Sequence, residues 1–118
     1  PNLFSNNEKD ILEGKIELAK NIAKSTNKEG VKAAQLGMAE RPDRTEILEN
    51  LDAKILIIAG KYDNAVKTEN LLKIIPEKTN IKTYVLDCGH NGHWEKPTIC
   101  AEIINTELLH NLPKHFLL

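Results

Sequence analysis

Cysteine is scarce in this chain, and no stretch of it stays apolar for long. Its 118 residues include two cysteines, Cys88 and Cys100, which are too few for the disulfide framework of a small secreted domain. No apolar run approaches the roughly 20 residues that a membrane-spanning helix needs. We therefore predict no membrane-spanning segment, and we interpret both cysteines as free thiols in a reducing, cytoplasmic environment.

An excess of charge of either sign is also lacking. Sixteen basic residues stand against 17 acidic ones, which gives a net charge of −1 at pH 7, and no basic run occurs. Binding to nucleic acid or to an anionic membrane surface relies on clustered positive charge. We therefore expect neither as a partner. Residues 1–4 have neither the charged start nor the apolar core of a signal peptide, so we expect no such leader.

Helical periodicity dominates the first fifty residues. Ser5-Asn-Asn-Glu8 has the form of a capping box, and apolar residues recur at helical spacing after it, to about Asn27. A second helix is predicted over residues 28–40, although Gly30 and Gly37 weaken it by up to about 1 kcal/mol each relative to alanine. We interpret these glycines as sites of helix–helix packing, with the close approach of another backbone as the alternative.

Two strands are predicted in the second half. Ile55–Ala59 is an uninterrupted apolar run closed by glycine, typical of a parallel strand buried on both faces, and Ile81–Leu86 is the second candidate. Short helices are predicted over residues 45–51 and 71–75, and a last one from Pro97. The predicted apolar face of that last helix comprises Ile99, Cys100, Ile103, Ile104 and Leu108. The alternation predicts an α/β fold with two parallel strands and flanking helices.

An acidic residue and a histidine follow the two predicted strands. Asp63 lies in the loop after the first, and His90 in the loop after the second. Ligands of open parallel sheets bind outside the carboxyl ends of the strands. We therefore expect the two side chains to meet there, with a carboxylate oxygen within about 3.2 Å of a ring nitrogen. That contact is the acid–base half of a catalytic triad.

Other roles for these residues stay open. Asp63 could cap the next helix or shape a turn, and His90 could be a surface loop histidine. Zinc binding is a further possibility, because Cys88, His90, His93 and Glu95 are competent ligands within eight residues. Their spacing is not a common structural zinc pattern, so we expect no bound metal, and we expect no cofactor.

The predicted sheet is incomplete. Two strands do not form a stable sheet that is covered on both faces, and residues 1–50 supply no strand candidate. We therefore expect the chain to be the C-terminal part of a larger domain. The bare edge of residues 55–59 would then be covered by the missing N-terminal part of the same protein or by another copy of this chain.

Two motifs resemble the closing segment of the α/β-hydrolases. They are Gly60-Lys-Tyr-Asp63 and the later stretch Gly89-His-Asn-Gly-His-Trp-Glu-Lys-Pro97. Residues 31–50 also resemble the segment that joins the helical cap to the core in this family. The resemblance implies a helical cap portion over residues 1–44 and the C-terminal part of the hydrolase core over residues 45–118.

The resemblance also implies roles for single residues. Asp63 matches the triad acid and His90 the triad base. His93 matches a position where the family often has a histidine that lines the site, so it is a candidate substrate-binding residue. The family's nucleophile, a serine on a Gly-x-Ser-x-Gly elbow or an aspartate in dehalogenases, comes earlier in the chain. The two serines here, Ser5 and Ser25, are not flanked in that way, and no His-Gly-Gly oxyanion-hole motif occurs.

The implied activity of the complete protein is therefore acyl transfer, with hydrolysis of a small ester or a related bond. Dehalogenation, epoxide opening, C–C bond hydrolysis and cofactor-free peroxidation stay open, because substrate choice depends on parts of the family fold that are missing here. The partner of the complete protein would be a small-molecule substrate, whereas this chain alone is expected to be inactive. The alternative hypothesis is a non-enzymatic interaction fragment that pairs its sheet edge with a partner.

Overall fold

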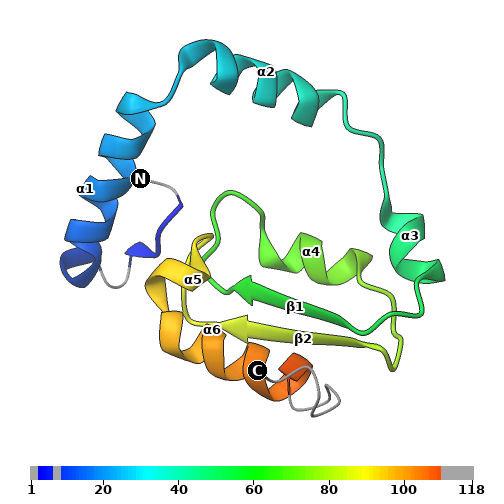
Figure 1. Cartoon of the computed structure of the whole chain (residues 1–118). Helices are drawn as coiled ribbons and strands as arrows, with labels where there is room; N and C mark the ends of the chain where they lie inside the picture. The colour runs from blue at the N-terminus through cyan, green and yellow to red at the C-terminus, as the bar shows by residue number, and fades with distance from the viewer. Residues whose placement is uncertain (1–2, 7–8, 110–118) are drawn as a thin grey trace.

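The computed structural model describes residues 3–6 and 9–109 and centres on a two-stranded parallel sheet (Figure 1). The strands are β1, Ile55–Gly60, and β2, Ile81–Leu86. They pair in register, so that Gly60 lies opposite Leu86 at the carboxyl end of the sheet. Both strands agree with the sequence prediction, and the fold is α/β. The register brings the loops that follow the two strands to the same edge.

Helices follow each strand. Helix α4, Thr68–Ile74, links β1 to β2, and after β2 come α5, Gly92–Glu95, α6, Pro97–Ile104, and the π-helical turn η2, Asn105–Leu109. Pro97 begins α6, where its fixed backbone angle suits the first turn. Helix α5 was not predicted, because four residues are too short for a helical period to show. It lies immediately after His90, so it bears directly on that residue's position.

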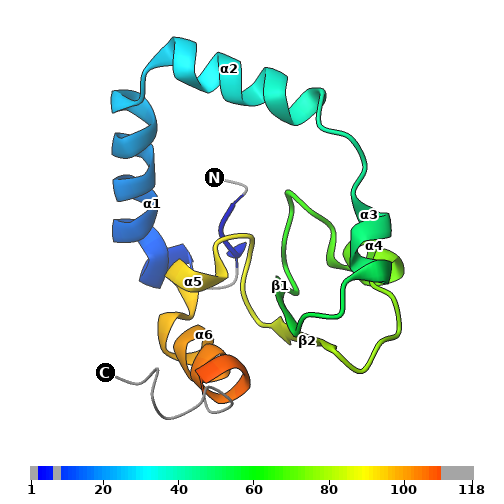
Figure 2. The ribbon, with the colours of Figure 1, turned by 45° about the vertical axis from the view of Figure 1, so that its right-hand side comes forward.

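Three helices of the described residues precede the sheet. They are α1, Lys9–Ser25, α2, Lys28–Ala39, and α3, Thr45–Asn50. Figures 1 and 2 show them as an arc that begins near α5 and ends beside the amino ends of the strands. Asn27 caps α2, since its Oδ1 accepts hydrogen bonds from the backbone N–H groups of Glu29 at 2.9 Å and Gly30 at 3.2 Å. Helix α2 buries none of its residues.

The structure corrects one prediction about these helices. A Cβ added at Gly37 would meet nothing within 4 Å, and one added at Gly30 would meet only its own cap residue, Asn27, at 4.0 Å. The prediction of helix–helix packing at these glycines is therefore wrong, because no described element packs against that side of α2. The predicted capping box Ser5-Asn-Asn-Glu8 falls partly on residues 7 and 8, and α1 is described from Lys9 onward. Glu8 lies outside the described residues.

The buried core gathers at the carboxyl end of the sheet. Its apolar members among the described residues are Phe4, Leu12, Ala59, Cys88 and Cys100. The predicted burial of β1 on both faces is wrong, because Ile55–Ile58 are only half-buried and full burial begins at Ala59. Among the described residues, β1 has one strand neighbour, and the arc of helices does not cover it. Apolar side chains of the helices are also exposed, among them three of the predicted apolar face of the last helix. They include Leu18, Ile22, Val31, Met38, Ile99, Ile104 and Leu108.

No helix among the described residues has both the length and the apolar character that crossing a membrane requires.

A buried carboxylate fastens the last turn to the sheet. Glu107 of η2 accepts hydrogen bonds from Lys82 Nζ at 2.7 Å and from Tyr84 Oη at 2.5 Å, and Lys54 Nζ lies 3.4 Å from its other oxygen. These donors, first of all Lys82, hold the pKa of Glu107 at about 2, below its ordinary value of 4.5. Ionised Glu107 is therefore bound more strongly in the folded chain than in the unfolded one.

Acid should weaken the fold through Glu107. A lowered folded-state pKa gives stability that is present above the unfolded value of 4.5 and is lost as the pH falls toward about 2. We expect the urea midpoint to fall across that window and Glu107→Gln to flatten the fall. Glu102→Gln removes an exposed carboxylate from α6 and serves as the matched control. A Glu107→Gln profile that parallels the original chain would contradict the assignment.

Candidate active site

Asp63 and His90 meet at the carboxyl end of the sheet, as the sequence predicted. His90 Nδ1 lies 2.8 Å from Asp63 Oδ2. Asp63 is three residues beyond β1, and its backbone N–H donates to Gly60 O at 3.0 Å in a tight turn. The side chain of Asp63 is 10% exposed and that of His90 is 40% exposed. The acid is thus enclosed by its own loop, while the imidazole is partly open to solvent.

The two carboxylate oxygens of Asp63 have separate partners. Oδ1 accepts hydrogen bonds from the backbone N–H groups of Ala65 at 2.8 Å and Val66 at 2.9 Å, whereas Oδ2 faces His90. The turn-forming role that the sequence left open is therefore present together with the histidine contact. One oxygen shapes the loop, and this fixes the direction of the other.

Electrostatics favour the ionised form of Asp63. Burial opposes ionisation, but the hydrogen bonds from Val66, His90 and Ala65 outweigh it and hold the pKa of Asp63 below its usual value. A carboxylate on Nδ1 stabilises the tautomer in which Nδ1 carries the proton. No described residue forms a hydrogen bond with His90 Nε2. That nitrogen is then left as a proton acceptor that faces away from the acid.

Backbone contacts join the two loops behind this pair. Lys61 N–H donates to Leu86 O at 2.8 Å, and Tyr62 N–H donates to Cys88 O at 2.9 Å. Gly60 makes this approach possible, because a Cβ there would lie 2.0 Å from Gly89 O and 2.7 Å from Cys88 O. Glycine is required here because it is small and not because of its backbone conformation, since no described glycine has a positive φ. The distance between Asp63 and His90 is thus set by main-chain packing.

Glu95 belongs to the site region, whereas the sequence indicated it only as a possible zinc ligand. It is 6% exposed and accepts hydrogen bonds from Gly89 N–H at 2.9 and 3.0 Å and from Ser5 N–H at 3.0 Å. The signal in the sequence was weak: an acidic residue in a short segment between a glycine-rich loop and Pro97. Its second partner, Ser5, is 90 residues away, so no local pattern indicates that contact.

The residues considered as zinc ligands do not gather around one point. Within residues 3–6 and 9–109, no group of three or more His, Cys, Asp or Glu side chains is placed to hold a metal ion. Glu95 is directed at backbone N–H groups, and Cys88 is 1% exposed. Burial, and then the charge of Glu95, raises the pKa of Cys88 to about 11. Its thiol is therefore a poor nucleophile at neutral pH.

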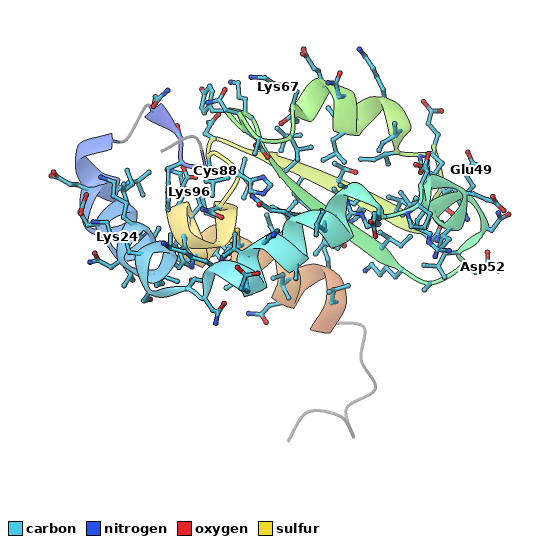
Figure 3. All side chains as sticks on the ribbon, turned by 90° about the horizontal axis from the view of Figure 1, so that it is seen from above. Lys24, Glu49, Asp52, Lys67, Cys88 and Lys96 are labelled. Carbon is cyan, nitrogen blue, oxygen red and sulfur yellow. The ribbon has the colours of Figure 1, made fainter. Side chains whose placement is uncertain are left out.

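His93 and Asp63 line different cavities. His93 is exposed on α5 with its ring edge-on to Trp94, at 6.2 Å between centroids, and lines a hollow of about 270 Å³ beside α1. Asp63 lines a larger hollow of about 470 Å³ together with Lys61, Tyr62 and Lys67. The structure thus brings Asp63 and His90 together and does not bring His93 into contact with them. Figure 3 places Cys88 beside α5, with Glu49 and Asp52 at the opposite end of the sheet.

Comparison with family models and with curated proteins finds no match to this chain. The assignment of a function therefore rests on the geometry of the two loops.

Proposed function

We propose that this chain supplies the acid and the base of a nucleophile–His–Asp triad of the α/β-hydrolase type. The observation that carries the proposal is the contact of 2.8 Å between His90 Nδ1 and Asp63 Oδ2, formed where two parallel strands end. In that arrangement the acid orients the base, and the base presents its second nitrogen to a nucleophile. Residues 1–44 would then be part of a helical cap, and residues 45–118 part of the core.

The proposed chemistry follows from the two nitrogen atoms of His90. Nε2 would take the proton of the nucleophile, return it to the leaving group, and then activate water to release the acyl group. Asp63 would keep the proton on Nδ1 and stabilise the imidazolium that forms. The substrate class best matched is a small ester or a related bond. The free thiols of Cys88 and Cys100 fit a reducing compartment such as the cytoplasm.

Under this proposal the nucleophile of the triad would lie on polypeptide outside these 118 residues. Ser5 is 2% exposed in the core, and Ser25 ends α1, where its Oγ donates to Ile22 O at 2.9 Å. Neither stands on a strand-to-helix turn of the kind that presents a nucleophile. Cys88 is buried with a raised pKa. No serine or cysteine of the described chain therefore suits attack on a substrate.

The test compares this chain with the complete polypeptide. We expect the 118 residues alone to hydrolyse activated esters no faster than free imidazole, because they lack a nucleophile. The reading frame upstream of Pro1 should encode a glycine-flanked serine or aspartate, and the complete product should be active.

In the complete product, His90→Ala should reduce kcat by about three orders of magnitude or more. His93→Ala, which changes a histidine of the same segment, is the matched control and should retain most of the activity. Saturable esterase activity of the 118 residues, or full activity of the His90→Ala protein, would contradict the proposal.

A second candidate function is that of an interaction fragment, and the open edge of β1 favours it. Within the described residues, β1 pairs with β2 alone, and its apolar side chains from Ile55 to Ile58 are half-exposed. An uncovered edge offers unpaired backbone groups to another strand. The occupant would be another copy of this chain or the remainder of its parent.

Association in solution tests the open edge. We expect the isolated chain to form dimers or larger species at tens of micromolar, because pairing at β1 would satisfy the backbone groups and cover apolar side chains. Size-exclusion chromatography with light scattering, over a dilution series, measures the mass directly. A monomer of 13.3 kDa with a cooperative thermal transition would show that the chain covers its own edge, contrary to this expectation.

A further inference from the structure

The loop that carries His90 is held by main-chain contacts on both sides of that residue. Before His90, Gly89 N–H donates to both oxygens of Glu95, at 2.9 and 3.0 Å. After it, Asn91 N–H donates to Leu3 O at 3.1 Å. Ser5 N–H donates to Glu95 Oε2 at 3.0 Å. Glu95 thus joins the histidine loop to a segment from the other end of the chain.

We propose that Glu95 is a positioning residue that keeps His90 in contact with Asp63 by fixing Gly89. This inference rests on the proposed role of His90 as a base. Gly89 directly precedes His90, so the orientation of its peptide sets the direction from which the imidazole leaves the backbone. Because Asp63 Oδ2 is itself directed by its own turn, a small rotation at Gly89 would open the contact of 2.8 Å.

A carboxylate is the group that suits this position. It offers acceptor sites only, and all its partners here are N–H donors. Burial of an ionised carboxylate is unfavourable unless hydrogen bonds replace its water, and the N–H groups of Ser5 and Gly89 do so. Gly89 leaves the space, because a Cβ there would lie 2.6 Å from Ser5 N and 2.9 Å from Glu95 Oε1.

The segment around Ser5 completes the arrangement. Phe4 is 3% exposed, and its ring lies 6.1 Å from that of Trp94, next to Glu95 in the chain. Lys15 Nζ of α1 also donates to Trp94 O. These contacts hold α5 while Glu95 holds the loop. A purely structural role for Glu95 would account for stability, but it would not require any change at the His90 ring when Glu95 is altered.

The variant Glu95→Gln separates these roles, because glutamine has nearly the same shape. If its oxygen replaces Oε2 and accepts from Ser5 N–H, its amide nitrogen replaces Oε1, 2.9 Å from Gly89 N. Two donors then oppose each other at that contact, and Gly89 N–H keeps only its weaker bond of 3.0 Å to the remaining oxygen. A lost hydrogen bond to a charged acceptor typically changes an equilibrium about tenfold to a hundredfold, so exchange of the His90 Nδ1 proton with water should accelerate by about tenfold or more. The neutral ring should also shift toward the Nε2–H tautomer.

The measurement is nitrogen-15 NMR of the imidazoles in the intact chain. Glu107→Gln is the matched control, since it also removes a buried carboxylate that accepts several hydrogen bonds. Glu107 acts on Lys82 and Tyr84 and not on the His90 loop. We expect it to lower stability while the exchange rate and tautomer of His90 stay as in the original chain.

Three outcomes would overturn the inference. They are an unchanged His90 signal in folded Glu95→Gln, equal changes in Glu95→Gln and Glu107→Gln, and failure of Glu95→Gln to fold, which would make Glu95 a requirement of the fold. The NMR readout does not depend on activity. A complete protein that lacks esterase activity would refute the proposed function and leave the link between Glu95 and His90 standing, whereas an unchanged His90 signal would refute only that link.

Discussion

Asp63→Asn should reverse the tautomer of His90 without moving the ring far. In the structure, Asp63 Oδ1 accepts from the N–H groups of Ala65 and Val66, and Oδ2 faces His90 Nδ1. An asparagine at this position keeps its single oxygen on the two N–H groups, since an amide nitrogen cannot accept from them. Its NH₂ group must then face His90.

The consequence for the ring follows directly. An NH₂ donor requires an unprotonated Nδ1, so the neutral imidazole must carry its proton on Nε2. That nitrogen is the one that should accept the proton of a nucleophile. In serine-type triads the corresponding change lowers kcat by about 10⁴-fold. We expect a loss of that order in the complete protein and an Nε2–H tautomer in the 118-residue chain.

Long-range proton–nitrogen correlation at a pH where the ring is neutral distinguishes the tautomers. The original chain should show Nδ1–H at His90, and the Asp63→Asn chain should show Nε2–H. Asp87→Asn is the matched control, because Asp87 is exposed in the loop after β2 and pairs with Lys61 at 3.5 Å. It should leave the tautomer unchanged. An original chain with Nε2–H at His90 would remove the basis for the triad assignment.

Gly60→Ala should destabilise the fold more than any other single methyl addition among the described glycines. The added Cβ would lie 2.0 Å from Gly89 O, 2.7 Å from Cys88 O and 2.8 Å from Gly89 C. All three are backbone atoms, so no side-chain rotation relieves the contact. Overpacking costs typically about 1–3 kcal/mol of unfolding free energy, and we expect the upper end or more here.

The substitution Gly60→Ala should also disturb the candidate site. To admit the methyl group, the His90 loop must move away from β1, which would weaken the bond from Tyr62 N–H to Cys88 O. Urea denaturation measures the loss of stability, and the His90 Nδ1 proton reports the movement. Gly37→Ala is the matched control, since nothing lies within 4 Å of its Cβ position. Alanine is favoured by up to about 1 kcal/mol inside a helix, so that variant should be slightly more stable.

Two results would count against this account. Equal stability of Gly60→Ala and the original chain would mean that the loops do not approach each other as closely as the structure has them. A large loss in Gly37→Ala would mean that α2 packs against something at that face.

Local patterns in the sequence were sufficient to predict both strands, every described α-helix except α5, and the meeting of Asp63 with His90. The apolar run of β1 and the proline that begins α6 act over a few residues, so their effects are visible without a tertiary structure. The contact between acid and base was predictable for a related reason. Parallel strands of equal length end at the same edge, so the loops after them must come together.

Burial and the supporting contacts were decided only by the tertiary structure. Leu12 and Leu18 are both leucines of α1, yet one is 1% and the other 53% exposed, because the helix meets the core only near its start. Glu95 looks like a surface residue or a metal ligand in the sequence, and it is buried because Ser5, 90 residues away, brings an N–H group to it. Gly60 needs no special backbone angle, so its requirement arises entirely from Gly89 on the neighbouring loop. Such contacts join residues that are distant in the chain, and periodicity describes only neighbours.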